Sequence, residues 1–206
     1  MFVTFEGLDG CGKSTQLQAL AARLRALGLD VVATREPGGT ALGERIRELA
    51  LAAGATAPET ELALMTASRA QNTTEVILPA LQRGAWVLCD RYLDATLAYQ
   101  GGGRGLDAAV IAELHRLLCH NLLPDLTLIL DLDPAVSLGR ARTRHSGGSE
   151  GRFEAEAQAF FQRVHRAYYE VARLHPDRCR LVQALGTVAE VGERVWQQVQ
   201  PLTPQP

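Results

Sequence analysis

Apolar residues along this chain fall into two alternating patterns. Five short runs are apolar at nearly every position, which predicts buried strands at residues 2–6, 30–34, 86–89, 126–130 and 179–182. The unbroken run at 126–130 suits a parallel sheet that is covered on both faces. Between these runs, apolar positions recur every three or four residues, which is the spacing of an amphipathic helix.

The helical stretches have recognisable ends. The first contains Leu17, Leu20 and Leu24 and stops at Gly28. Further helices are expected at 41–53, 58–81, 93–100, 107–119, 134–142, 153–174 and 187–199. A proline should open the helix at 58 and another should bend it at 79, and the glycines of 101–105 should break the helix at 93–100. The inward face of the helix at 153–174 is predicted to hold Phe160, Phe161, Val164, Tyr168 and Val171.

Strands and helices alternate throughout the 206 residues, which predicts one α/β domain spanning residues 1–206. We expect a five-stranded parallel sheet with helices on both faces. In such sheets, ligands bind at the carboxyl ends of the strands. The polar residues that follow each predicted strand are therefore the candidates for a functional site.

Composition excludes several classes of protein. The formal net charge is −2, whereas a general nucleic-acid binder shows a basic excess, so no nucleic-acid partner is expected. No apolar run reaches membrane-spanning length, and a strand that begins at residue 2 leaves no room for a signal peptide, so no membrane partner is expected either. The four cysteines lack metal-ligand spacing, which favours reduced thiols in a cytoplasmic protein.

The most specific motif is G-x-x-x-x-G-K-S at residues 7–14, between the first strand and the first helix. Lys13 is the only lysine among 21 basic residues. A compact ammonium reaches phosphate oxygens where the bulkier guanidinium would displace the loop. Gly7 and Gly12 let backbone N–H groups close around phosphate, the helix N-terminus adds its positive dipole end, and Ser14 can place a hydroxyl on Mg²⁺.

Polar clusters also follow the second and third predicted strands. Residues 34–40 read TREPGGT and carry Arg35, and residues 90–92 read DRY and carry Arg91. The two arginines should converge near the phosphate loop. Two guanidinium groups beside such a loop suggest a second phosphorylated ligand in addition to one nucleotide.

A Gly-rich segment at about 140–152 forms a fourth polar cluster. It indicates a mobile lid that delivers positive charge when it closes. Its basic residues are Arg140, Arg142, Arg144, His145 and Arg152.

With the phosphate loop, three motifs make the sequence resemble the bacterial thymidylate kinases: TREPGG at 34–39, DRY at 90–92 and AYQGGGRG at 98–105. The resemblance runs from about Phe2 to Val199 and implies the P-loop nucleoside monophosphate kinase fold. It further implies a homodimer that transfers the γ-phosphoryl group of ATP to dTMP, with Mg²⁺ as the cofactor, in dTTP biosynthesis.

The resemblance also implies roles for individual residues. Arg35 and Arg91 would hold the dTMP phosphate, and Asp9 would accept a hydrogen bond from the 3′-hydroxyl. Tyr99 would disfavour a 2′-hydroxyl. Ser14 and Asp90 would serve the metal. The residues expected to bind ATP are Gly7, Leu8, Asp9, Gly10, Cys11, Gly12, Lys13, Ser14 and Thr15. Those expected to bind dTMP are Asp9, Arg35, Met65, Arg69, Arg91, Thr96, Tyr99 and Gln100, with Arg69 facing the thymine edge.

Family members of one kind carry a basic residue in the phosphate loop, and those of the other kind supply it from the lid. Gly10 stands at that loop position, so this chain resembles the second kind. The catalytic residues would then be Lys13, Asp90, Arg91, Arg142, Arg144 and Arg152.

Two positions depart from the family pattern. Met65 replaces a phenylalanine that usually stacks on thymine, and Ala95 replaces a common serine. A thioether packs on a ring face less rigidly. These departures leave the selectivity between dTMP and dUMP open, and the sequence also leaves open whether the Glu36-Pro37 bond is cis.

Four other classes of nucleotide-binding protein share a phosphate loop of this kind. A deoxynucleoside kinase would need a base for a neutral hydroxyl, for which Glu6 is available, but it does not call for paired arginines. A kinase for another monophosphate such as dUMP and a non-catalytic nucleotide-binding module also stay open. A GTPase should carry N-K-x-D, which a chain with one lysine at position 13 lacks.

Overall fold

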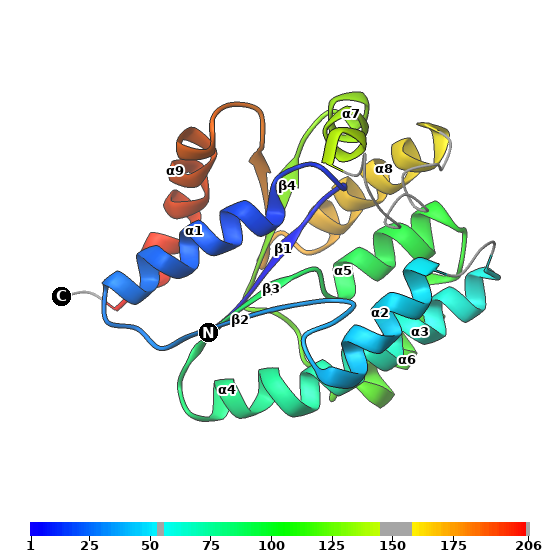
Figure 1. Cartoon of the computed structure of the whole chain (residues 1–206), viewed down its shortest axis with the longest axis horizontal. Coiled ribbons are helices and arrows are strands. Elements are labelled where there is room, and N and C mark those ends of the chain that lie inside the picture. Colours follow the sequence, from blue (N-terminus) through cyan, green and yellow to red (C-terminus); the bar gives the residue numbers. More distant parts are fainter. Residues whose placement is uncertain (53–55, 145–157, 205–206) are drawn as a thin grey trace.

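The computed structural model describes residues 1–52, 56–144 and 158–204, with residues 141–144 described by their backbone alone. Five parallel strands form one sheet in the order β2-β3-β1-β4-β5 (Figure 1). They are β1 (Phe2–Glu6), β2 (Val31–Arg35), β3 (Trp86–Asp90), β4 (Leu126–Asp131) and β5 (Cys179–Gln183). The predicted strands are confirmed, with every end within one residue.

The helices lie on both faces of this sheet, as expected (Figure 1). They are α1 (Lys13–Ala26), α2 (Ala41–Ala52), α3 (Pro58–Asn72), α4 (Leu78–Gln82), α5 (Leu93–Thr96), α6 (Ala108–Leu118), α7 (Pro134–Arg144), α8 (Gln158–Leu174) and α9 (Val188–Val199). Two π-helical segments, η1 (Thr73–Ile77) and η2 (Leu97–Gly103), and a 3₁₀ turn, η3 (Gln200–Leu202), complete the described elements.

Alternation along the strands divides the core between the two faces. On one face, Val3 and Phe5 of β1 pack in a buried cluster with Leu20 of α1 and Val195 of α9. On the other face, Phe2 packs with residues of α3 and α6, and a further cluster joins η2 to α8. The predicted inward face of α8 is confirmed, because all five of its residues are buried.

The helix beginning at Leu93 does not break at the glycines, which corrects the sequence-based expectation. It continues as η2 to Gly103, because these glycines allow close packing against α8. A Cβ atom on Gly103 would lie 2.7 Å from the Phe160 ring, and one on Gly102 would collide with Ala167. The glycine run therefore brings two helices together instead of ending one.

Two other helices differ in detail from the prediction. The helix expected at 58–81 is divided by the wider turn of η1, which directly precedes the segment containing Pro79. A π turn is a common adjustment where the regular hydrogen-bond ladder is disturbed. Helix α7 runs two residues beyond its expected end at 142, and the expected start of the last long helix at 153 lies outside the described residues. No helix in the described ranges is both long and apolar enough to cross a membrane.

Candidate active site

The loop between β1 and α1 has the geometry of a phosphate-binding loop. Gly7 has φ +129°, and a Cβ atom there would lie 2.6 Å from the Leu130 carbonyl oxygen, so only glycine fits. Gly12, with φ +100°, is the N-cap of α1 and supplies no side-chain cap. The first N–H groups of α1 are thus directed at whatever anion the loop holds.

Lys13 lies inside this loop and is 6% exposed. Its ammonium donates hydrogen bonds to the carbonyl oxygens of Leu8 at 2.8 Å and Gly7 at 3.2 Å. These contacts, together with one to the Cys11 sulfur, hold the cation over the loop. The positive charge is therefore positioned before any phosphate arrives.

A central cleft opens at the carboxyl ends of β1, β2 and β3. Its lining residues are Asp9, Gly10, Gly12, Lys13, Ser14, Arg35, Glu36, Arg47, Asp90 and Arg91. Within this lining, the Ser14 hydroxyl donates to an Asp90 carboxylate oxygen at 2.5 Å. Arg35 lines the cleft with its guanidinium bound to Glu44, whose Oε2 lies 2.7 Å from Nη2.

Arg91 reaches the cleft from an unusual backbone. Its φ is +70°, in the left-handed region that costs a non-glycine residue about 1–3 kcal/mol. Its guanidinium pairs with Asp9 at 2.5 Å and lies 4.6 Å from the centre of the Tyr99 ring. Burial opposes the charge, but Asp9 and its neighbours raise the pKa of Arg91 above its ordinary value. The guanidinium is therefore a cation at neutral pH.

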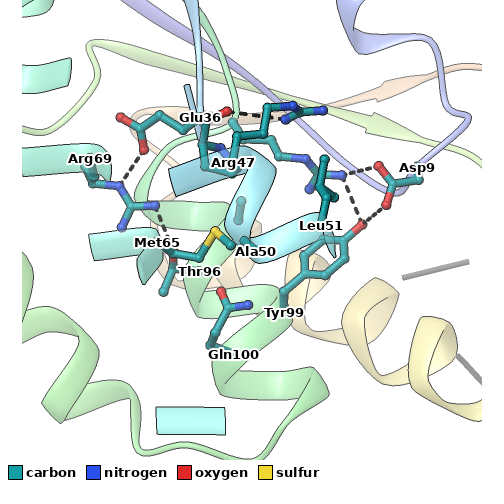
Figure 2. Close-up of a pocket in the computed structure, with 13 residues that line it drawn as sticks. Asp9, Glu36, Arg47, Ala50, Leu51, Met65, Arg69, Thr96, Tyr99 and Gln100 are labelled. Carbon is teal, nitrogen blue, oxygen red and sulfur yellow. Dashed lines mark hydrogen bonds and ion pairs between the residues drawn. The ribbon is translucent and has the colours of Figure 1, made fainter. Parts of the chain in front are cut away.

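An inner cavity continues from the central cleft toward helices α2, α3 and η2 (Figure 2). It encloses about 840 Å³ of empty space including its open mouth, and it shares Asp9, Glu36, Arg47 and Arg91 with the cleft. Its other lining residues are Pro37, Ala50, Leu51, Met65, Arg69, Ala95, Thr96, Tyr99 and Gln100. Its mixture of apolar walls with a few polar groups is typical of small-molecule sites.

Arg69 forms one wall of the inner cavity and is 3% exposed. Its Nε donates to Glu36 at 2.7 Å, and its Nη2 donates to the Tyr92 carbonyl oxygen and to the Thr96 hydroxyl. Burial raises the pKa of Glu36, and the Arg69 cation acts against that rise. The Glu36-Pro37 bond is cis, which settles the point that the sequence left open.

An outer groove lies on the other side of the phosphate loop. Its lining includes Cys11 and Thr15 from the loop and α1, Arg140 from α7, and Gly186 and Thr187 before α9. The groove meets the central cleft at Gly10 and Gly12. The three hollows therefore form one continuous path with the phosphate loop in its middle.

The structure brings most of the sequence-predicted residues together. Of the expected dTMP ligands, all but Arg35 line the inner cavity, and Arg35 lines the central cleft. The residues expected to bind ATP line the central cleft or the outer groove, except Gly7 and Leu8. The carbonyl oxygens of these two residues accept hydrogen bonds from the Lys13 ammonium. Arg142 and Arg144 belong to α7 by their backbone, with side chains outside the described part, and Arg152 lies outside the described residues altogether.

Sequence reasoning missed the contribution of α2. Arg47, Ala50 and Leu51 line the inner cavity, and Arg47 also lines the central cleft. These positions are three and four residues apart, so they share one helix face. That spacing was visible in the sequence, but the segment carries no motif that singles it out.

Glu6 lies outside all three hollows. It is fully buried, and its carboxyl accepts hydrogen bonds from the Tyr92 backbone N–H at 2.7 Å and from the Tyr168 hydroxyl at 3.0 Å. Burial, followed by repulsion from Asp94, raises the pKa of Glu6 to about 8. A buried group with two structural partners is badly placed to act as the base of a deoxynucleoside kinase.

Comparison with known proteins decides the family. A family model described as thymidylate kinase matches residues 5–195. The chain belongs to the thymidylate kinase family. It is 50% identical over 195 residues to a thymidylate kinase of Thermomicrobium roseum, covering 95% of this chain and 92% of that protein. It is 55% identical over 193 residues to one of Pseudomonas entomophila, covering 93% and 90%.

Solved structures agree. A crystal structure of thymidylate kinase from Ehrlichia chaffeensis superimposes with a TM-score of 0.81 and 33% identity, covering 97% of this chain and 98% of that one. Thymidylate kinases are ATP-dependent phosphotransferases that act on a nucleoside monophosphate. The sequence-based predictions of family, fold and enzyme class are thus confirmed.

Proposed function

We propose that the thymidylate kinase reaction runs along the continuous path, with dTMP in the inner cavity and ATP on the phosphate loop. The observation that carries the proposal is the set of four residues shared by cavity and cleft: Asp9, Glu36, Arg47 and Arg91. A nucleoside in the cavity would extend its phosphate past these residues toward Lys13. The outer groove, which joins the loop from the other side, would take the nucleoside of ATP.

The chemistry of phosphoryl transfer suits these residues. A phosphate monoester has a second pKa near 6, so its attacking oxygen is already anionic at neutral pH and needs no strong base. The task of the protein is to align two polyanions and to offset their repulsion. Lys13 and Arg91 would supply positive charge on either side of the transferred group, with Arg35 and Arg47 beside the acceptor phosphate.

Ser14 and Asp90 would hold Mg²⁺. Their hydroxyl and carboxylate oxygens lie 2.5 Å apart beside the phosphate loop, and oxygen atoms are the ligands that Mg²⁺ prefers. The described residues include no group of three or more histidine, cysteine and acidic side chains that could hold a metal by themselves. That suits an ion that takes its remaining ligands from water and substrate phosphates, and that when bound neutralises phosphate charge.

The walls of the inner cavity support the expected base and sugar contacts. Arg69 and Thr96 present polar groups to the cavity, and Met65 offers a thioether to the face of a base. Tyr99 is held by Arg91, whose Nη2 donates to the phenolic oxygen at 3.2 Å. A ring fixed in this way would crowd a ribose 2′-hydroxyl and favour a deoxyribonucleotide.

A lid at about 140–152 would close over ATP and deliver arginine to the transferring group. Four free, buried cysteines support a reducing, cytoplasmic location. Exposed apolar residues on α2 and α6, such as Leu49 and Leu117, support a homodimer. Light scattering that returned the mass of one 22.3 kDa chain would contradict it.

Arg47 offers a direct test, because it is the cation that the cavity and cleft share through α2. Arg47→Met is expected to raise the KM for dTMP about 10- to 100-fold, since a charge-assisted hydrogen bond contributes about 1.5–3 kcal/mol, while the KM for ATP stays the same. Arg45→Met removes an exposed arginine from the same helix and is the matched control. Equal dTMP kinetics in the two variants would contradict the placement of the dTMP phosphate.

A further inference from the structure

Gln100 lines the inner cavity, and its amide lies below Met65 and Ala50 and points toward them (Figure 2). It is 4% exposed, so its amide meets the cavity and its protein neighbours and little else. An amide carries a donor at one end and an acceptor at the other. Which end faces a bound base therefore depends on what holds the opposite end.

Glu61 of α3 holds one end of this amide. It is 1% exposed, and its Oε1 lies 2.7 Å from the Gln100 side-chain nitrogen. The other carboxylate oxygen pairs with the Arg104 guanidinium at 3.2 Å. An ionised carboxylate only accepts hydrogen bonds, so Gln100 must turn its NH₂ group toward Glu61. Its carbonyl oxygen is then the group left to meet a ligand.

Arg104 is itself held in place. Its guanidinium lies 4.6 Å from the centre of the Phe160 ring of α8, and its side chain is 17% exposed. A guanidinium cannot accept a hydrogen bond, so it fixes the charge of Glu61 and cannot exchange roles with it. Arg104 thus fixes the position of the Glu61 carboxylate, and that carboxylate fixes the orientation of the Gln100 amide.

One helical turn before Gln100, the cavity wall has the opposite polarity. Arg69 offers only donors, and it donates to the Thr96 oxygen at 2.7 Å, which leaves the Thr96 hydroxyl proton free to donate as well. The cavity thus presents a fixed acceptor on Gln100 and fixed donors on the Arg69 side. Thymine and uracil complement this pattern with a protonated N3 and a carbonyl at C4. Cytosine opposes it at both positions, with an unprotonated N3 and an amino group at C4.

We propose that Glu61, anchored by Arg104, is a specificity-determining positioning residue that sets the polarity of Gln100 and so excludes cytosine nucleotides. The inference rests on the proposed placement of the dTMP base in the inner cavity. Glu61 does not contact the substrate, and it acts on the ratio of kcat/KM between thymine and cytosine nucleotides.

Glu61→Gln tests the proposal, because it should invert the amide and not merely loosen it. Arg104 would take the oxygen of the new amide, the amide nitrogen would then face Gln100, and Gln100 would turn its own NH₂ group into the cavity. We expect the ratio of kcat/KM for dTMP over dCMP to fall about 10- to 100-fold, because a mispaired buried polar contact costs about that much. The ratio of dTMP to dUMP should not change, because both bases present the same edge.

Arg104→Lys is the matched control, since it keeps a cation on Glu61 and should keep the dTMP to dCMP ratio. Gln100→Met, of similar length, covers the case in which Glu61→Gln does not fold. It should lower kcat/KM for dTMP at least about tenfold more than for dCMP. Thermal unfolding of each variant establishes that it is folded.

The outcomes separate the two claims. If Glu61→Gln lowers kcat/KM for dTMP and dCMP equally, or if Gln100→Met leaves their ratio unchanged, Glu61 is only a structural tie between α3 and η2 and the inference is wrong. If the wild-type protein fails to phosphorylate dTMP at all, the proposed function fails instead.

Discussion

Arg91 and its neighbours show what single residues contribute and what a motif leaves unsaid. The DRY motif predicts that Arg91 lies near the phosphate loop, but it does not predict the left-handed backbone of this residue. That conformation is held by hydrogen bonds from the Arg91 N–H to the Phe5 carbonyl oxygen and from the Tyr92 N–H to Glu6. The contribution of Glu6 to this backbone is not predictable, because a sequence does not show which carboxylates are buried.

Burial of Glu6 has a consequence for stability. The pKa of Glu6 is about 8 in the folded protein, against 4.5 for a glutamate in water, so the folded state binds the Glu6 proton more tightly than the unfolded state does. In the pH range between these two pKa values, the folded state keeps a proton that the unfolded state has lost. The free energy of unfolding therefore falls as the pH rises, by at most about 1.4 kcal/mol per pH unit from this group. Glu6→Gln removes this titration. Its free energy of unfolding, relative to wild type, should therefore increase steadily from pH 5 to pH 8.

Urea unfolding at several pH values between 5 and 8 measures this difference. Glu113→Gln is a suitable control, because Arg116 lowers the pKa of this exposed carboxylate and its difference from wild type should stay flat over the same range. Parallel profiles for wild type and Glu6→Gln would mean that Glu6 is ionised in the folded protein throughout.

At the scale of elements, strands were easier to predict than helices. A buried strand is marked by its own apolar residues, and the helix starts expected at 107 and 187 prove to be the N-caps of α6 and α9. The π-helical η2 was not predictable from local sequence, since its glycines normally end helices. They are explained by contact with Phe160 and Ala167, about 60 residues further along the chain. The α2 face of the cavity was missed for the same reason, because its meaning depends on distant partners.

The arginines of the proposed lid, Arg144 and Arg152, are expected to act on catalysis and not on dTMP binding. Arg144 lies at the end of α7, and Arg152 belongs to the part of the chain outside the described residues. Arg144→Ala or Arg152→Ala is expected to lower kcat by about 10³-fold, the effect of losing an arginine that stabilises the transferring phosphoryl group. The affinity for dTMP should change far less, because in the proposed arrangement other arginines hold the acceptor phosphate.

Steady-state kinetics with calorimetric dTMP binding separate the two effects. Arg166→Ala, which removes an exposed arginine from α8, controls for the loss of charge alone. Wild-type turnover in both lid variants would show that the lid supplies no catalytic charge.

The whole molecule places these parts around one edge of the sheet. Because β1 lies in the centre of the order β2-β3-β1-β4-β5, the phosphate loop that follows it is flanked by the loops after β3 and β4. The sequence predicted five parallel strands but not their order, since strand pairing depends on contacts between distant segments. The central claim concerns the whole path: a deoxynucleoside monophosphate with a thymine-like base fills the inner cavity while ATP occupies the loop.

Coupled ADP release with MgATP, comparing dTMP, dUMP, dCMP, dGMP and thymidine at equal concentration, tests that claim most directly. The account predicts strong turnover of dTMP, little of dCMP and dGMP, and none of thymidine, which lacks the phosphate that Arg47 and Arg91 would hold. The rate with dUMP reports how firmly Met65 packs on the base. Turnover of thymidine in the absence of any reaction with dTMP would contradict the account, because the arginines around the central cleft would then have no acceptor phosphate to bind.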